Sequence, residues 1–157
     1  MNSRTGIDKS GFSPSEWLAA IIESSDDAIV GKMLDGTITS WNPSAERLFG
    51  YSQNEALGQN ITLIIPPERL HEELDIISRI RAGQRIEHFE TVRRHKSGRP
   101  LYISVTISPV RDENGIIVGA SKIARELSDH WRSEELLRLA SDATNMGRQS
   151  RRCLALV

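Results

Sequence analysis

The chain has 157 residues and a formal net charge of −1, with 38% hydrophobic and 26% charged residues. These proportions are typical of one globular domain rather than a disordered chain, and the near-zero charge gives no global attraction to nucleic acid, so we expect no nucleic-acid partner. No apolar run reaches the roughly 18 residues of a membrane span, and the lone Cys153 excludes an intrachain disulfide, so we expect a cytoplasmic protein.

The N-terminal segment predicts a disordered lead-in and then an amphipathic helix. Residues 1–12 are polar and lack periodicity. Ser13 can cap a helix over 13–23, Pro14 suits its first position, and Glu16 completes a capping box. Apolar residues then recur at helical spacing and give this helix one apolar stripe, formed by Trp17, Leu18, Ile21 and Ile22.

A β-hairpin and short helices are predicted next. Residues 28–30 and 37–41 have the composition of strands and are separated by a tight-turn signal. Asn42 is placed to cap the helix that follows, and Gly50 is placed to end it. A second short helix is predicted over 53–57.

A longer helix is predicted over 66–81, because two prolines open it and a glycine follows it. We expect one of its faces to cover a sheet. The apolar residues that share this predicted face are Leu70, Leu74 and Ile77.

Three consecutive strands are predicted over 87–94, 101–110 and 116–125. The middle strand alternates between an apolar face with Leu101, Ile103, Val105 and Ile107 and a second face with Tyr102, Ser104, Thr106 and Ser108. Basic residues around the preceding turn are expected to be solvated and to discourage edge pairing; they are Arg93, Arg94, Lys96 and Arg99.

This order of elements predicts an α+β fold with a five-stranded antiparallel sheet and short helices on one face. An N-terminal amphipathic helix and a C-terminal helix flank it. The expected organisation is a lead-in over 1–12, a domain with its N-terminal helix over 13–128, a linker helix over 129–147 and an irregular tail over 148–157.

One stretch is specific enough to suggest a family. It runs DGTITSWNPSAERLFGY from Asp35 to Tyr51, and EALG and IIPP follow it in order. Over Trp17 to Ser128 the chain resembles the PAS family, the sensory box of bacterial signalling proteins of the histidine-kinase type. The resemblance implies a PAS fold and a sensory role in signal transduction, with the C-terminal helix relaying a cue to a downstream effector domain or partner. Members usually join the last strand to the outgoing helix through an Asp-Ile-Thr triplet, which implies that Glu126, Leu127 and Ser128 transmit the signal here.

The sequence favours neither catalysis nor a resident cofactor. It has no glycine-rich phosphate loop, nucleophile elbow or kinase signature, so we expect no enzyme activity in this segment even if the parent protein is a histidine kinase. Haem-carrying relatives place a histidine on the long helix, but the local match puts that position at Glu73 rather than His71. Flavin photoreceptors need a cysteine where Ile61 stands. No histidines are paired at metal-ligand spacing, so no metal site is expected either.

Two interpretations of the inner apolar residues stay open. They line a pocket for a small apolar ligand of unknown identity, or they fill a dry core. The residues concerned are Ile29, Ile38, Phe49, Leu63, Leu74, Ile77, Val105, Ile107 and Ile123.

We expect a homodimer built from the flanking helices, because a short amphipathic helix needs packing to be stable in water. The alternative is that the first helix folds back over the outer face of its own sheet. The predicted contacts are Trp17, Leu18, Ile21 and Ile22 from the first helix and Leu136, Leu139 and Ala143 from the last. The alternatives to a ligand-sensing module are a ligand-free protein–protein interaction domain and a cofactor-carrying redox or gas sensor.

Overall fold

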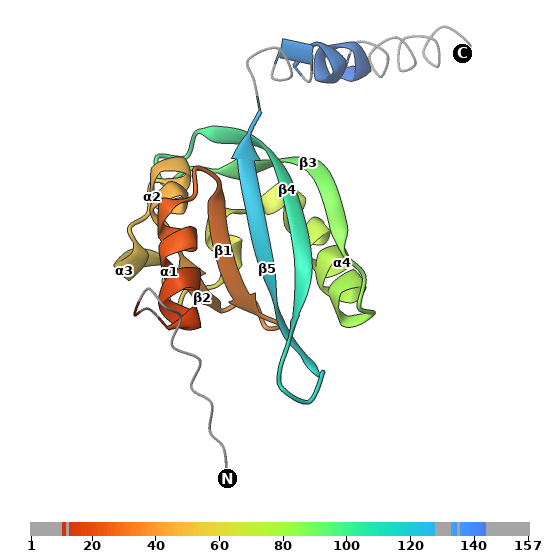
Figure 1. The fold of residues 1–157 in the computed structure, drawn as a ribbon. Helices are drawn as coiled ribbons and strands as arrows, with labels where there is room; N and C mark the ends of the chain where they lie inside the picture. The colour runs from red at the N-terminus through yellow and green to blue at the C-terminus, as the bar shows by residue number, and fades with distance from the viewer. Residues whose placement is uncertain (1–10, 12, 128–132, 135, 144–157) are drawn as a thin grey trace, which may run out of the picture. The chain divides into compact units, whose positions relative to one another are not determined.

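The computed structural model describes residues 11, 13–127, 133–134 and 136–143 (Figure 1). The chain divides into two units, 1–126 and 127–157, each considered by itself. The helices of the first unit are α1 (Pro14–Ser24), α2 (Pro43–Phe49), α3 (Gln53–Ala56) and α4 (Leu70–Arg81), with 3-10 turns η1 (Ile61–Ile64) and η2 (Pro67–Arg69). Its strands are β1 (Ala28–Met33), β2 (Ile38–Trp41), β3 (Ile86–Arg94), β4 (Pro100–Arg111) and β5 (Ile117–Glu126).

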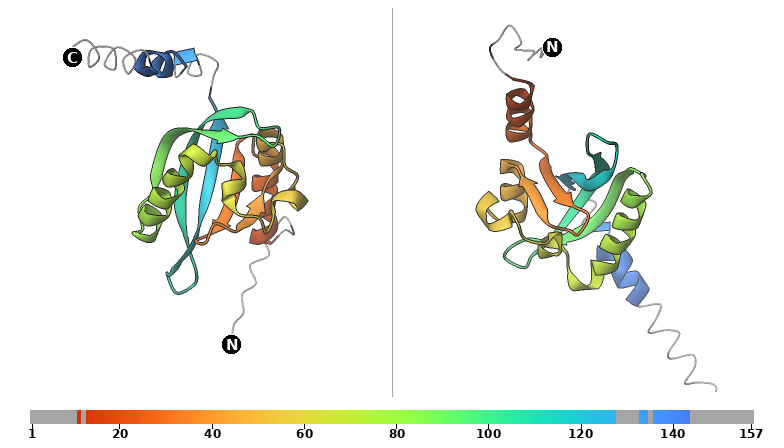
Figure 2. Two further views of the ribbon diagram at one scale, coloured as in Figure 1. Left: turned by 180° about the vertical axis from the view of Figure 1, so that it is seen from behind. Right: turned by 90° about the horizontal axis from the view of Figure 1, so that it is seen from below.

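The five strands form one antiparallel sheet in the order β2-β1-β5-β4-β3. This confirms the predicted α+β arrangement. The last strand, β5, lies at the centre of the sheet between β1 and β4. α4 covers one face, called the inner face below, whereas α1 projects away on the opposite side (Figures 1 and 2). Residues of α2, α3, η1 and α4 pack with the inner-face residues of the strands into one apolar core.

The predicted helix caps are confirmed. Ser13 Oγ accepts a hydrogen bond from the Glu16 amide at 3.3 Å, and Glu16 Oε2 accepts one from the Ser13 amide at 2.6 Å, so α1 begins with a capping box. Asn42 caps α2 by accepting from the Ala45 amide at 2.9 Å. Gly50 ends α2 with a φ of 82°, a conformation that glycine adopts without steric cost.

α4 turns a different side to the sheet from the one predicted. Leu74 is 77% exposed, and Leu70 is exposed as well. The residues that α4 buries are Glu73, Ile76 and Ile80. The Glu73 carboxylate can occupy this inward position because two lysines of the sheet pair with it there. The predicted apolar face of the helix, with Leu70 and Leu74, is therefore not the face that is buried.

In the second unit, residues 133–134 and 136–143 are helical. The predicted lead-in is described only at Gly11, and the predicted tail over 148–157 lies outside the described residues. None of the helices in the described part of the chain is long and apolar enough to cross a membrane.

Candidate functional site

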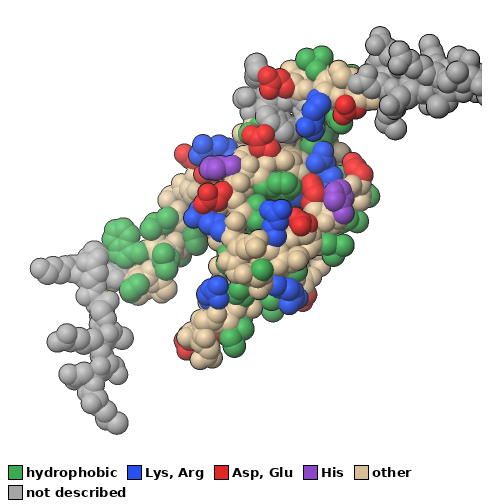
Figure 3. Space-filling model, turned by 90° about the vertical axis from the view of Figure 1, so that its right-hand side faces the viewer, with side chains coloured by type: hydrophobic (Ala, Val, Ile, Leu, Met, Phe, Trp, Pro, Cys, Tyr) green, Lys and Arg blue, Asp and Glu red, His purple; other side chains and the backbone are tan. Residues whose placement is uncertain are grey.

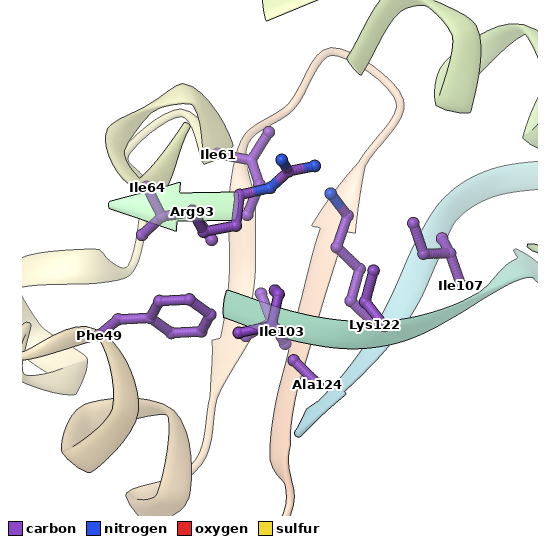
Figure 4. Close-up of a pocket in the computed structure, with 10 residues that line it drawn as sticks. Phe49, Ile61, Ile64, Arg93, Ile103, Ile107, Lys122 and Ala124 are labelled. Atoms are coloured by element: carbon purple, nitrogen blue, oxygen red, sulfur yellow. The ribbon is translucent and has the colours of Figure 1, made fainter. Parts of the chain in front are cut away.

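A small cavity lies between the inner face of the sheet and the elements that cover it (Figure 4). Its water-accessible volume is about 10 Å³, which is room for about one water molecule. The walls are mostly apolar, but two cationic side chains reach it. The lining residues are Val30, Phe49, Ile61, Ile64, Arg93, Ile103, Val105, Ile107, Lys122 and Ala124.

Some of the residues predicted for a pocket line this cavity, and others belong to the surrounding core. Phe49, Val105 and Ile107 are lining residues. Ile38 is buried in the core without reaching the cavity. Leu63 and Ile77 are only partly buried and do not line it.

The prediction was wrong for three positions. Leu74 points to solvent on α4, as described above. Ile29 and Ile123 are paired across β1 and β5 and lie on the outer face of the sheet, where Ile123 is 44% exposed. The inner-face positions of β5 are instead Lys122 and its small neighbours Ala120 and Ala124, so the assumption that the largest apolar residues face inward failed on this strand.

The most unusual feature beside the cavity is a buried cluster of charges. Lys122 Nζ donates a hydrogen bond to Glu73 Oε2 at 3.2 Å, and Lys32 Nζ contacts the other carboxylate oxygen. The side chains of Lys32 and Lys122 are 0% and 7% exposed. One carboxylate of α4 is therefore shared by lysines from β1 and β5.

A second ion pair lies next to the first. Arg93 Nη1 donates to Glu72 Oε1 at 3.0 Å, and Thr91 Oγ1 donates to the same carboxylate at 2.5 Å. Arg69 Nη1 reaches Thr91 Oγ1 at 3.2 Å. The side chain of Arg93 is 3% exposed. The expectation that Arg93 is solvated is thus wrong. The sequence did not reveal its partner, because Glu72 lies 21 positions away in the chain.

The electrostatics of the cluster disfavour full protonation of the lysines. Burial, reinforced by repulsion from Lys122 and Arg93, lowers the pKa of Lys32 to about 6. Burial, followed by repulsion from Arg93, lowers the pKa of Lys122 to about 7. Both values lie below the ordinary lysine pKa of 10.5. Attraction between Lys122 and the Glu72 carboxylate opposes these effects without offsetting them, so one proton is easily lost from the pair.

Sequence reasoning missed this cluster although the signal was present. Lys32 falls in step with Ala28 and Val30 at the period of two expected for one face of a strand. Glu73 falls in step with Ile76 and Ile80 at helical spacing. A charged residue on an otherwise buried face predicts a buried ion pair, but the partner can be chosen only once the fold is known.

The outer side of the domain presents a different surface. Every residue of α1 is exposed, and its apolar stripe is 50% exposed at Trp17, 61% at Leu18, 58% at Ile21 and 37% at Ile22. Figure 3 shows a patch of hydrophobic side chains exposed on one side of the molecule. The stripe is therefore largely exposed at the surface of the domain.

The remaining predicted positions lie at the surface or outside the described residues. Glu126 is exposed at the end of β5, and Leu127 is partly buried, whereas Ser128 is outside the described residues. Exposed helix positions in the second unit include Leu136, Leu139 and Ala143. His71 is exposed on α4, and no group of three or more His, Cys, Asp or Glu residues in the described ranges could hold a metal ion.

Comparison with known proteins gives a consistent picture. The model of the family described as the PAS fold matches residues 16–127. The PAS domain of a protein from Colwellia psychrerythraea is 31% identical, with a TM-score of 0.67 over 72% of this chain and 96% of that one. The PAS domain of an HTR-like protein from Haloarcula marismortui is 24% identical, with a TM-score of 0.62 over 72% of this chain and 91% of that one.

One similar curated protein is a full-length signalling enzyme. The signal transduction histidine-protein kinase AtoS of Escherichia coli (strain K12) is 23% identical over 127 residues, which make up 81% of this chain. The matched part is only 20% of the kinase, so the chain spans about a fifth of that relative.

Proposed function

This chain belongs to the PAS family, and from that premise we propose that it is a sensory and dimerisation module of a bacterial signal-transduction protein, with a histidine kinase as the candidate parent. The observation that carries the proposal is the exposed apolar stripe of α1. The similarity to a segment of AtoS supports a kinase context. Catalysis, in this proposal, belongs to other domains of the parent, and the module works in the cytoplasm.

A second copy of the chain is the natural cover for α1. Trp17, Leu18, Ile21 and Ile22 would leave water on pairing with the same stripe of another copy, and burial of such side chains stabilises association. Leu136, Leu139 and Ala143 are exposed in the second unit and would extend the interface. The predicted contact is isologous, with the same residues contributed by both copies.

The contacts around the end of β5 support a relay from the sheet to the flanking helices. Arg125 Nε and Nη2 donate to the Asp27 carboxylate at 3.2 and 3.3 Å, which joins the end of β5 to the segment between α1 and β1. The next residues are Glu126, Leu127 and Ser128. A shift of β5 would therefore move both the segment between α1 and β1 and the residues that follow β5.

Two alternatives remain testable beside this one. The small volume of the cavity favours a ligand-free interaction domain over a cofactor-carrying redox or gas sensor. We expect the purified protein to be colourless, without bound haem or flavin. A visible absorption spectrum distinguishes these cases, because a stoichiometric haem or flavin band would support the cofactor-carrying sensor.

Light scattering tests the dimer directly. The unmodified chain should have twice its 17.6 kDa mass. Replacing Trp17 and Ile21 together by Glu should give a monomer whose circular dichroism still shows the folded sheet. Replacing Ala19 and Ala20 by Glu adds the same charge to the other side of α1 and should leave the dimer intact. A monomeric unmodified chain over a wide concentration range contradicts the proposal.

A further inference from the structure

The two halves of α4 are attached to the domain in different ways. In the second half of the helix, Ile76 and Ile80 are buried in the apolar core. In the first half, 70–75, the side chains turned toward the domain are the carboxylates of Glu72 and Glu73, and the other positions are exposed. The first half of α4 is therefore held by charge pairing, whereas the second half is held by apolar packing.

More positive than negative charge converges on these two carboxylates. The cations that pair with them come from four different elements and are Lys32 on β1, Arg69 on η2, Arg93 on β3 and Lys122 on β5. All of these cations except Arg69 are almost completely buried. With every group ionised, the cluster carries an excess of buried positive charge, which is strongly unfavourable. The folded domain can reduce this excess by losing a proton from a lysine.

Opening of the first half of α4 would reverse that proton loss. While the helix is in place, burial lowers the pKa of Lys32 to about 6 and that of Lys122 to about 7. Once water reaches the two amines, the pKa of each returns toward the ordinary value of 10.5. Opening therefore takes up protons from solvent at every pH between these values, so acidification through this range favours the open form.

We propose that the cue sensed by this domain is the proton, and that acidification releases the first half of α4 from the sheet. Lys32 and Lys122 are the sensing groups, and they take up protons as Glu73 leaves them. Ile76 and Ile80 keep the second half of the helix in the core. The released turn has lost its tertiary contacts, so it also unwinds, because a short helix is marginal alone in water.

Release of α4 bears on the proposed relay through the central strand. Lys122 lies on β5, and the same strand carries Arg125, whose ion pair joins it to Asp27 in the segment between α1 and β1. The open form no longer ties this strand to α4. That the release acts as a signal rests on the proposed sensory function, whereas the release itself does not.

Hydrogen exchange followed by NMR at pH 7 and pH 8 tests the inference, with each rate compared with the intrinsic rate of the same amide at the same pH. The amides of 74–77 report the opening, because their helical hydrogen bonds end on the first turn of α4. The amides of β4 report unfolding of the sheet. A local opening predicts less protection for 74–77 than for β4.

The protection of the amides of 74–77 should also fall by about tenfold or more from pH 8 to pH 7, since each proton taken up on opening contributes about tenfold per pH unit. Equal protection of these amides and those of β4 overturns the inference. Protection of 74–77 that does not change with pH overturns it as well.

Variants identify the groups that take up the protons. Lys122→Met removes one of the two sensing amines, so the change in protection between pH 8 and pH 7 should shrink several-fold. Lys96→Met removes an exposed lysine, and His71→Gln removes an exposed histidine on the same half of α4; both should leave the change as it is. An equal change in the unmodified chain and in Lys122→Met overturns the assignment of the sensing groups. The pH series on the unmodified chain decides whether α4 opens even if this variant does not fold.

Light scattering at pH 8 tests the proposed dimer separately. A monomer in which acid still releases α4 would reject the dimer and leave this inference intact. A dimer whose amides of 74–77 are as protected as those of β4 would support the proposed function and reject this inference.

Discussion

Glu73 on α4 accepts a hydrogen bond from Lys122 on β5 at 3.2 Å, and these residues stand 49 positions apart in the chain. The bond ties α4 to the central strand of the sheet. The same carboxylate contacts Lys32 on β1, so one side chain holds α4 against two neighbouring strands. The inner side of this domain therefore depends on charge pairing as well as on apolar packing.

Removing the charge of Glu73 should destabilise the domain strongly. Glu73→Gln leaves two buried lysines without their carboxylate, and we expect the free energy of unfolding to fall by about 3 kcal/mol. Urea denaturation followed by circular dichroism measures this loss. Asp75→Asn is the matched control on the same helix, because its pair with Arg79 is exposed and contributes about 0–1 kcal/mol. Equal losses in both variants would mean that the buried pairing contributes little.

The same cluster predicts how stability depends on pH. Burial lowers the pKa of Lys32 to about 6 and that of Lys122 to about 7, whereas an unfolded lysine titrates near 10.5. Between these values the unfolded chain binds more protons than the folded one, so the free energy of unfolding should rise with pH through this window. We expect a gain of at least about 1 kcal/mol between pH 6 and pH 9, since one pKa unit corresponds to about 1.4 kcal/mol.

Lys122→Met provides the control for that titration. It removes one of the two groups with a lowered pKa, so the rise of stability with pH should become shallower. An identical slope with and without Lys122 would show that other groups cause the pH dependence.

The sequence was sufficient wherever neighbours in the chain determine the structure. The caps at Ser13 and Asn42 and the end of α2 at Gly50 depend on residues a few positions away, and the structure confirms them. The alternation of β4 was correct for the same reason. Leu101, Ile103, Val105 and Ile107 are all buried, as predicted.

The sequence was insufficient where distant residues decide which side faces inward. Leu74 and Ile123 were expected inside because they are apolar, but Glu73 and Lys122 occupy the inner positions of their elements. Each charge is acceptable there only because the other is present. The hydrophobicity of one residue carries no information about a partner elsewhere in the chain, so the prediction failed on α4 and β5 together.

The two faces of β4 should respond very differently to the same substitution. Val105→Asp places an unpaired carboxylate in the core and should cost several kcal/mol or prevent folding. Thr106 is the next residue and points to the outer face of the sheet, so Thr106→Asp should destabilise the domain much less. Tyr102, which was predicted on the same face as Thr106, is only 9% exposed and would be a poor control. Thermal unfolding of the two variants measures the difference, and equal shifts would contradict the assignment of faces.

Asn42 uses its whole amide group to join three elements. Its Oδ1 accepts from the Ile29 amide on β1 and the Ala45 amide on α2, both at 2.9 Å. Its Nδ2 donates to the Ile22 carbonyl on α1 and to the Asp27 carbonyl, both at 3.0 Å. The side chain is buried, so water cannot replace any of these bonds.

Asn42→Asp should loosen α1 without unfolding the sheet. The new oxygen cannot donate to the Ile22 and Asp27 carbonyls, while the retained oxygen still caps α2. We expect a loss of about 1–3 kcal/mol, because the Asp27 carbonyl loses its donor, whereas the Ile22 carbonyl still accepts from the Ser25 amide at 3.4 Å. Hydrogen exchange should show faster exchange of the α1 amides than of the β4 amides, since a helix of 11 residues is marginal alone in water. Asn114→Asp, in the exposed turn between β4 and β5, should leave both rates unchanged. Uniform acceleration across α1 and β4 would instead mean that Asn42 supports the whole domain rather than the attachment of its N-terminal helix.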